Sequence, residues 1–199
     1  MNNRSFFIFK FLHERACVAA LEFALIAPLL IVVFLGVYEV ADYVRATMRT
    51  DQTAQSVAQL IAAQAAVTNP ANPGPFDSGT LTDYCWAAHT VIAPYNPANL
   101  TLQIASYTLS GAVTSEDWGV TCPPNNTTSA ISGFAPGVPI SGLLLASGDS
   151  VIVVKASYQW AAPDGGLFLH SIITASETVY ARPRSNKTIT CSVSNSTSC

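Results

Sequence analysis

One acidic side chain stands out among the residues that could do chemistry, because it lies inside an apolar run. Glu22 is the only charged residue between Val18 and Val37. An ionised carboxylate in the hydrocarbon of a bilayer costs about 2.5–3.5 kcal/mol even on lenient insertion scales. Glu22 therefore needs either a positively charged partner or a position at the headgroup level, where its side chain reaches water. The residues alone leave both interpretations open.

Histidines and paired carboxylates are the side chains that most often carry acid–base catalysis, and neither is arranged for it here. Glu116 and Asp117 are adjacent, so in a strand they would point to opposite sides, and we interpret them as part of a solvated loop. G-x-S-x-G, H-E-x-x-H and Gly-rich phosphate motifs are absent from the sequence. We predict that the chain is not an enzyme and has no cofactor, metal site or small-molecule substrate. The histidines are His13, His89 and His170.

The cysteines indicate an oxidising compartment. Cys17 precedes the apolar run, whereas Cys85, Cys122, Cys191 and Cys199 follow it. Four such cysteines predict two disulfides with three possible connectivities. We favour Cys85–Cys122 and Cys191–Cys199, because each pair closes its own local loop. Four free thiols are the alternative, since no C-x-x-C spacing indicates a metal site.

The apolar run is long enough to cross a membrane, which takes about 20 residues. Residues 1–17 form a basic lead that contains Arg4, Lys10 and Arg15. Because Lys and Arg beside a first membrane helix stay in the cytoplasm, we predict a cytoplasmic N-terminus and an exported remainder. A cleaved signal peptide is the competing interpretation, with an apolar region of about 7–15 residues and a small-residue cleavage site. The longer run, without an A-x-A break, favours a single-pass anchor.

Composition and charge limit the size and the partners of the exported part. The chain has 199 residues, of which 50% are hydrophobic and 11% charged, with a net charge of -3. This length allows one anchor and one modest domain. Lys and Arg are absent between Arg49 and Lys155, so a groove that follows a phosphate backbone is not expected. We therefore predict no nucleic-acid partner.

The apolar segment continues into an amphipathic one. We predict one helix over residues 18–68, with a membrane part at 18–38 and an exported amphipathic part at 39–68. Pro28 removes a backbone hydrogen bond, so we predict a kink there. Charged residues recur at three- and four-residue spacing after the membrane part, which allows ion pairing along the helix. They are Glu39, Asp42, Arg45 and Arg49.

The remaining residues predict a small α+β domain. A Pro-rich linker at 69–80 ends the long helix, and residues 81–184 form the exported domain. Alternating apolar and polar residues predict strands, and the Pro/Gly break at 162–166 favours an antiparallel hairpin. The tail, residues 185–199, is polar and expected to be loosely held. The expected elements are a helix at 81–93 and strands at 100–109, 116–121, 150–161 and 171–181. The predicted fold class is α+β, with a long membrane-spanning α-helix packed on a small antiparallel β-sheet.

The sequence V-A-A-L-E-F-A-L-I-A-P-L-L, from Val18 to Leu30, resembles the N-terminal motif of TadE-like proteins. These are pseudopilins, or minor pilins, of the tight-adherence (Tad/Flp) subclass of type IV pilus systems. The resemblance rests on Glu22 and Phe23, a short apolar spacer, Pro28 and a long apolar helix with a charged exit. It implies a pilin-like fold and cleavage by a prepilin peptidase on the cytoplasmic side of the helix.

In this family the Glu stands fifth in the mature chain, which implies a cut between Cys17 and Val18. The position before the cut is usually Gly, and this chain has Cys17 there. Cleavage would leave a positively charged amine on Val18, four residues from Glu22 and on the same helix face. The resemblance thus implies that Glu22 and Phe23 act in assembly and subunit register.

The implied partners are the inner membrane, a prepilin peptidase and other pilins or pseudopilins of the Tad system. The implied location is the bacterial inner membrane, with the C-terminal domain in the periplasm and, after assembly, in an extracellular pilus. The alternative is a stand-alone, single-pass, envelope-anchored binding or adhesion protein that does not enter a fibre.

Overall fold

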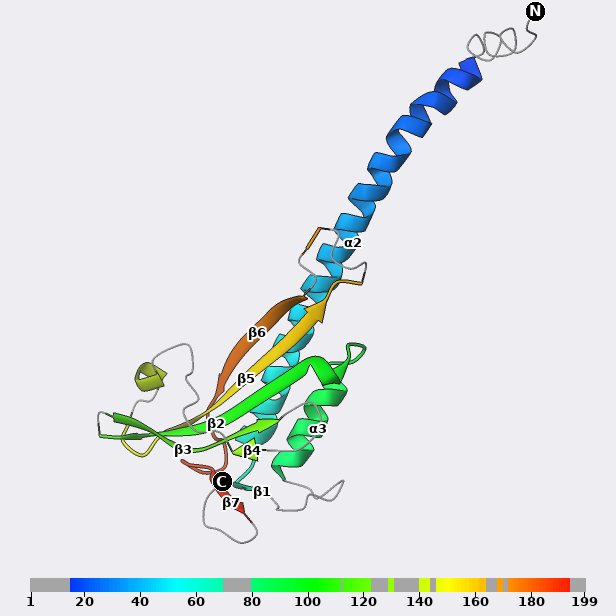
Figure 1. The fold of residues 1–199 in the computed structure, drawn as a ribbon. Coiled ribbons are helices and arrows are strands. Elements are labelled where there is room, and N and C mark those ends of the chain that lie inside the picture. The colour runs from blue at the N-terminus through cyan, green and yellow to red at the C-terminus, as the bar shows by residue number, and fades with distance from the viewer. Residues whose placement is uncertain are drawn as a thin grey trace, which may run out of the picture. The chain divides into compact units, whose positions relative to one another are not determined.

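The computed structural model describes residues 15–69, 80–111, 113–122, 129–130, 140–143, 146–163, 168–169 and 172–193. The chain divides into two compact units. The first, here called the helical unit, comprises Met1–Asp42 and Ala162–Ser171. The second, the sheet unit, comprises Tyr43–Ala161 and Ile172–Cys199. One helix, α2 (Arg15–Ala62), contributes to both units (Figure 1).

Helix α2 is continuous through Pro28, so the kink expected at this residue stays a prediction. The helix ends at Ala62, six residues before the predicted end at Thr68. A distant segment accounts for this difference. The carbonyl oxygen of Ala62 accepts a hydrogen bond from the Arg184 backbone N–H at 2.8 Å, and that of Ala63 accepts one from Ser185 Oγ at 2.9 Å. These donors satisfy carbonyls that a longer helix would have paired internally.

The sheet unit contains a five-stranded antiparallel sheet in the order β4-β3-β2-β5-β6. The fold is therefore α+β, as predicted. The break at 162–166 does separate an antiparallel pair, because β5 and β6 pair from Ile152↔Ala181 to Ala161↔Ile172. The strands are β2 (Leu100–Ser110), β3 (Val113–Cys122), β4 (Ser129–Ala130), β5 (Ser150–Ala161) and β6 (Ile172–Ala181) (Figure 1).

One face of this sheet receives the C-terminal part of α2. Leu102 and Ile104 on β2 lie opposite Ala156 and Val154 on β5, and all four are buried. Residues opposite one another across an antiparallel pair share a face. Trp160 lies on the same face of β5, two residues after Tyr158. The centroid of its ring is 5.5 Å from that of Tyr43 on α2. The buried helix residues are small or branched: Ala46, Ala54, Val57, Ala58 and Ile61.

The opposite face of the sheet carries a smaller apolar cluster. Ala105 and Tyr107 on β2 lie opposite Val153 and Val151 on β5. Ile140, from the short helix η2 (Ile140–Leu143), packs in the same cluster. Both faces of the central strands are thus buried, which explains the long apolar run that β5 carries.

Helix α3 (Leu81–Val91) is attached to the sheet by a disulfide. Cys85 on α3 is bonded to Cys122 at the end of β3, with the two Cα atoms 5.6 Å apart. This is the pairing favoured from the sequence. Thr80 caps the helix through its side chain, which accepts from the Asp83 N–H. A 3-10 helix, η1 (Pro97–Asn99), leads from this helix into β2.

Strand pairing, a hydrogen bond and a disulfide fix parts of the segment after β6 up to residue 193, whereas we expected this tail to be loose apart from any Cys191–Cys199 disulfide. Strand β7 (Thr190–Val193) pairs in parallel with β1 (Ala66–Asn69), and Trp118 Nε1–H donates to the Ile189 carbonyl at 2.7 Å. Cys191 is disulfide-bonded. Its expected partner, Cys199, lies outside the described residues, as does most of the Pro-rich linker (70–79).

Candidate functional site

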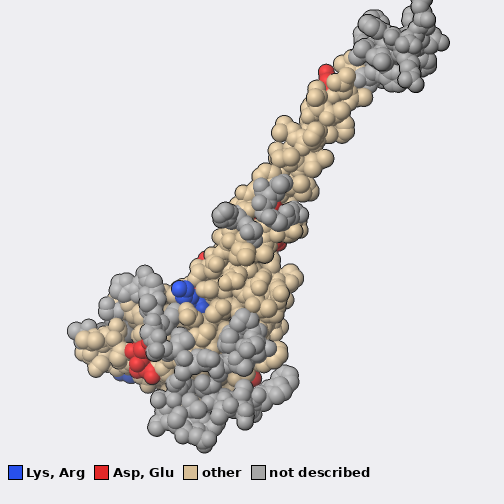
Figure 2. Space-filling model, viewed as in Figure 1, with Lys and Arg blue, Asp and Glu red and all other residues tan. Residues whose placement is uncertain are grey.

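The N-terminal part of α2 presents an apolar surface that the described residues leave largely uncovered. The most apolar 18-residue window of Val18–Ala62 contains no buried residue. Leu25 is 71% exposed and Phe34 is 70% exposed. Figure 2 shows this part of the helix as an almost uninterrupted uncharged surface. By length and composition it is a candidate membrane span near the N-terminus. A continuous exposed apolar surface of this kind indicates a membrane or a protein partner.

The residues that the sequence singled out for processing lie at the start of this helix. Val18 and Glu22 are both exposed, and their four-residue spacing places them on one face about 6 Å apart along the axis. Phe23 follows and is 68% exposed. Cys17 belongs to the helix, but its side chain lies outside the description. The helix therefore places the Val18 backbone and the Glu22 carboxylate close enough to interact if a charged amine forms at Val18.

A second carboxylate, at the other end of the apolar segment, is a site that the sequence did not reveal. Glu39 is fully buried. Its Oε2 accepts hydrogen bonds from the backbone N–H groups of Phe168 and Leu169, at 3.1 and 3.0 Å. The sequence pattern indicated only that Glu39 could form ion pairs along its own helix. The only available signal was its position as the first charged residue after the apolar run, because its donors lie 129 and 130 residues away.

The adjacent acids Glu116 and Asp117 lie in strand β3, so our interpretation of them as a solvated loop was wrong. The pairing with β2 shifts between Ser106 and Tyr107, which leaves Asp117 as the extra residue of a β-bulge. Its Oδ2 accepts hydrogen bonds from Ser106 Oγ at 3.2 Å and from Thr108 Oγ1. The Tyr107 hydroxyl donates to Glu116 Oε2 at 3.3 Å. The bulge thus gives each carboxylate a hydroxyl donor.

The environment of Tyr107 changes its acidity. Burial raises the pKa of the phenol to about 12, and the charge of Glu116 and their hydrogen bond act in the same direction. The hydroxyl therefore stays protonated through the physiological range and serves as a fixed donor. Burial also raises the pKa of Tyr84 on α3, assisted by the charge of Asp83.

The start of α3 contains polar atoms that are buried without hydrogen-bond partners. They are Thr82 Oγ1, Asp83 Oδ2 and the hydroxyl of Tyr84. Such groups cost stability, because they give up water without gaining a partner. They lie within the helix that the Cys85–Cys122 disulfide fixes to the sheet.

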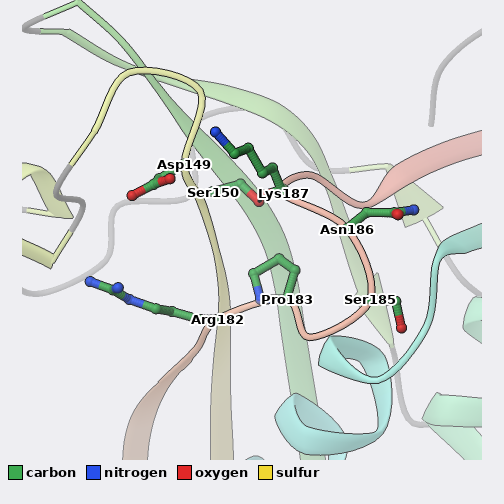
Figure 3. A pocket seen from close by; sticks show the side chains of 7 residues that line it. All are labelled: Asp149, Ser150, Arg182, Pro183, Ser185, Asn186 and Lys187. Atoms are coloured by element: carbon green, nitrogen blue, oxygen red, sulfur yellow. Dashed lines mark hydrogen bonds between the residues drawn. The ribbon is translucent and has the colours of Figure 1, made fainter.

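The hollow drawn in Figure 3 has a volume of about 380 Å³, and charged and polar side chains are among those that line it. Arg182 and Lys187 bring two cations to a wall that also carries the carboxylate of Asp149 (Figure 3). Ser150 uses its hydroxyl to bond the Lys187 carbonyl at 2.6 Å, so it supports the wall. Among the described residues, three or more His, Cys, Asp or Glu side chains do not gather as metal ligands would.

The similarity to known proteins covers part of helix α2 and does not extend to the sheet. A family model described as TadE-like protein matches residues 18–59. No curated protein and no solved structure matches the chain. The matched segment contains Glu22, Phe23 and Pro28, begins at Val18, and stays within α2. Over residues 18–59, this chain is therefore similar to TadE-like proteins.

Proposed function

We propose that the chain is a pseudopilin or minor-pilin-like structural component in the assembly of a Tad type IV pilus, and that it is processed by a prepilin peptidase. The observation that carries the proposal is the TadE-like match at residues 18–59, over a helix whose most apolar window has no buried residue. A role as a structural subunit accounts for a large apolar surface better than catalysis does. The helix would hold the chain in the inner membrane before assembly.

The geometry at the start of α2 supports cleavage between Cys17 and Val18. The family match starts at the residue that cleavage would make the first. The new amine would carry a positive charge and share a helix face with the exposed carboxylate of Glu22. That amine, on the same chain or a neighbouring subunit, would relieve the cost of placing Glu22 in an apolar environment.

Helix α2 also has surface to offer other subunits beyond the membrane segment. Val40, Val44 and Met48 recur every four residues, and their side chains are 49%, 42% and 60% exposed. This stripe continues the exposed apolar side of the helix, whereas Ala46, Ala54 and Val57 face the sheet and are buried. An amphipathic helix that keeps an apolar stripe uncovered fits packing against the helices of other pilins.

The experiment that tests processing is determination of the mature N-terminus in cells with an active prepilin peptidase. N-terminal sequencing or intact mass should show Val18 as the first residue. An intact Met1 would contradict the proposal. The matched variant Cys17→Gly restores the residue usual before the cut, so it should increase the processed fraction.

Incorporation into a fibre needs a separate measurement. Purified pili should contain the processed chain when probed with an antibody against the sheet unit. Glu22→Gln removes the negative charge while retaining a similar shape, so it should lower the amount of chain in the pilus fraction. If Glu22→Gln assembles as well as the wild type, the pairing of Glu22 with the amine is excluded.

A stand-alone, envelope-anchored binding or adhesion protein is the second candidate. Cys17 favours it, because this residue stands where the peptidase usually meets Gly. Such a protein would retain its basic lead and would be absent from purified pili. The N-terminal measurement therefore distinguishes the two functions.

A further inference from the structure

A contact between α2 and the connection from β5 to β6 is built around the carboxylate of Glu39. Glu39 is fully buried, although its neighbours Tyr38 and Val40 are 47% and 49% exposed. Two consecutive backbone N–H groups, of Phe168 and Leu169, donate to one of its carboxylate oxygens. A carboxylate removed from water needs donors of this kind, and charge-assisted bonds are the stronger ones. Glu39 and the connection therefore hold each other in place.

In the same contact, the aromatic ring of Phe168 lies over Gly36 of α2. Three ring atoms of Phe168 lie 3.5 Å from the point where a Cβ on Gly36 would stand. The ring therefore lies over Gly36 with room for a methyl group between it and the helix backbone. Phe168 nevertheless remains 47% exposed. One side of the ring thus contacts the helix while the other is uncovered.

The position of this ring along α2 corresponds to the edge of a bilayer. Glu22 and Glu39 are the charged residues that bound the apolar segment, and at 1.5 Å per residue they lie about 26 Å apart. The hydrocarbon core of a bilayer is about 30 Å thick. Gly36 lies about 4.5 Å from Glu39 toward the apolar side. The ring of Phe168 is therefore level with the boundary between hydrocarbon and headgroups if α2 spans the membrane.

We infer that Phe168, in the connection between β5 and β6, is a second membrane contact of this protein: its ring enters the lipid interface beside α2, and Glu39 holds it there. This inference rests on the proposed membrane anchor. Apolar side chains at an interface add binding in proportion to the area that they bury in lipid. A half-exposed phenylalanine continuous with the exposed apolar surface of the helix fits that role. The buried Glu39 also keeps its charge away from the lipid.

Tryptophan quenching by brominated lipids tests the contact in the full-length chain. Phe168→Trp would be reconstituted into phosphatidylcholine–phosphatidylglycerol vesicles with bromines near the headgroup or deep in the acyl chains. The wild-type signal from Trp86, Trp118 and Trp160 would be subtracted. Val37→Trp, at an exposed position of the apolar segment, is the positive control. Leu60→Trp, also exposed and 21 residues after Glu39 on the same helix, is the negative control.

The expected result is quenching of the residue-168 signal by the bromines near the headgroup, at least about twofold above the Leu60→Trp signal. If Val37→Trp is quenched and Phe168→Trp is not, the membrane anchor stands and the second contact is excluded. In that case the uncovered side of Phe168 faces water or a protein. If Val37→Trp is not quenched either, α2 does not cross the bilayer, and the anchor and this inference both fail.

Variants of the two helix positions test how the ring is held. Both variants are made in the Phe168→Trp background. Glu39→Ala removes the hydrogen-bond acceptor, and Gly36→Leu fills the space between the helix and the ring. Each should lower the quenching by at least about twofold. Gly36→Ala is the matched control, because a Cβ there meets the ring at an ordinary 3.5 Å and should leave quenching unchanged. Circular dichroism and an intact Cys85–Cys122 disulfide would show that each variant is folded. Unchanged quenching in folded Glu39→Ala and Gly36→Leu would overturn the positioning role of these residues.

Discussion

The two halves of helix α2 are continuous in sequence and differ in what covers them. In the half that belongs to the helical unit, large apolar side chains such as Leu25 and Phe34 are 71% and 70% exposed. In the half that belongs to the sheet unit, Val57 and Ile61 are fully buried. The more apolar half is the uncovered one. Apolar character alone therefore does not produce burial, which depends on a complementary surface in the same chain.

The two halves of α2 therefore differ in what stabilises them. The sheet unit obtains its own core from the buried face of α2, the two faces of the sheet and a disulfide. Among the described residues the exposed segment has no such partner, so we expect it to need a lipid or protein environment. Identical substitutions in the two halves should therefore have different consequences.

The largest effect should come from introducing a charge into each half. Val57→Asp places an unpaired carboxylate at a fully buried position and should destabilise the sheet unit by about 3–5 kcal/mol. Val33→Asp, at a position that is 54% exposed, should leave that unfolding transition unchanged and lower membrane integration, at a cost of about 2.5–3.5 kcal/mol. Denaturant unfolding measures the first effect, and flotation of vesicles measures the second. Equal effects of both variants on unfolding would remove the distinction between the halves.

The disulfide should affect the sheet unit alone. Cys85 and Cys122 are 37 residues apart in sequence, and replacing both with Ala should lower the free energy of unfolding by about 2–4 kcal/mol. The association of the chain with vesicles should not change, because the apolar part of α2 contains neither cysteine. Unfolding with and without a reductant provides the same comparison in the wild type. A stability that does not respond to the double replacement would contradict this prediction.

Alkaline pH should act on the sheet unit through Tyr107. The pKa of this phenol is raised from 10.0 to about 12, mainly by burial and also by Glu116. A raised pKa means that the folded state keeps its proton longer than the unfolded state. The resulting stabilisation is complete below pH 10 and is lost as the pH rises toward about 12. Unfolding free energies measured across this interval should fall less steeply in Tyr107→Phe than in the wild type; equal slopes would exclude this contribution.

The smallest effect is expected at Tyr84. Its hydroxyl is buried and has no hydrogen-bond partner among the described residues. Tyr84→Phe removes that unsatisfied group, so the free energy of unfolding should stay the same or rise by up to about 1 kcal/mol. Denaturant unfolding at neutral pH measures it. A clear loss of stability would show that the hydroxyl has a partner in solution.

Local sequence patterns were sufficient for most of the elements. The strand predicted at 150–161 is β5 with the same bounds, because its apolar alternation and the flanking turn residues act over short distances. Helix α3 and the β5–β6 hairpin were predictable for the same reason. The bulge at Asp117 was not predictable, because it depends on how β3 aligns with β2.

The residues of the candidate site also divide into those that the sequence identified and those that it did not. Glu22, Phe23 and Pro28 were identified from one continuous motif, and the family match covers all three. Glu39 and Phe168 were not identified as a pair, because their contact joins residues 129 positions apart. The sequence pattern around Glu39 does not show which distant segment supplies its hydrogen-bond donors.

By itself, the sequence determined the apolar helix, its position near the N-terminus, the alternating strands and the α+β class, since these follow from hydropathy and periodicity within short windows. The tertiary structure alone decided three other features. They are the end of α2 at Ala62, the parallel pairing of β1 with β7, and the burial of Glu39 beneath Phe168 and Leu169. Each depends on hydrogen bonds between groups more than a hundred residues apart in sequence, and such bonds form only when folding brings the segments together.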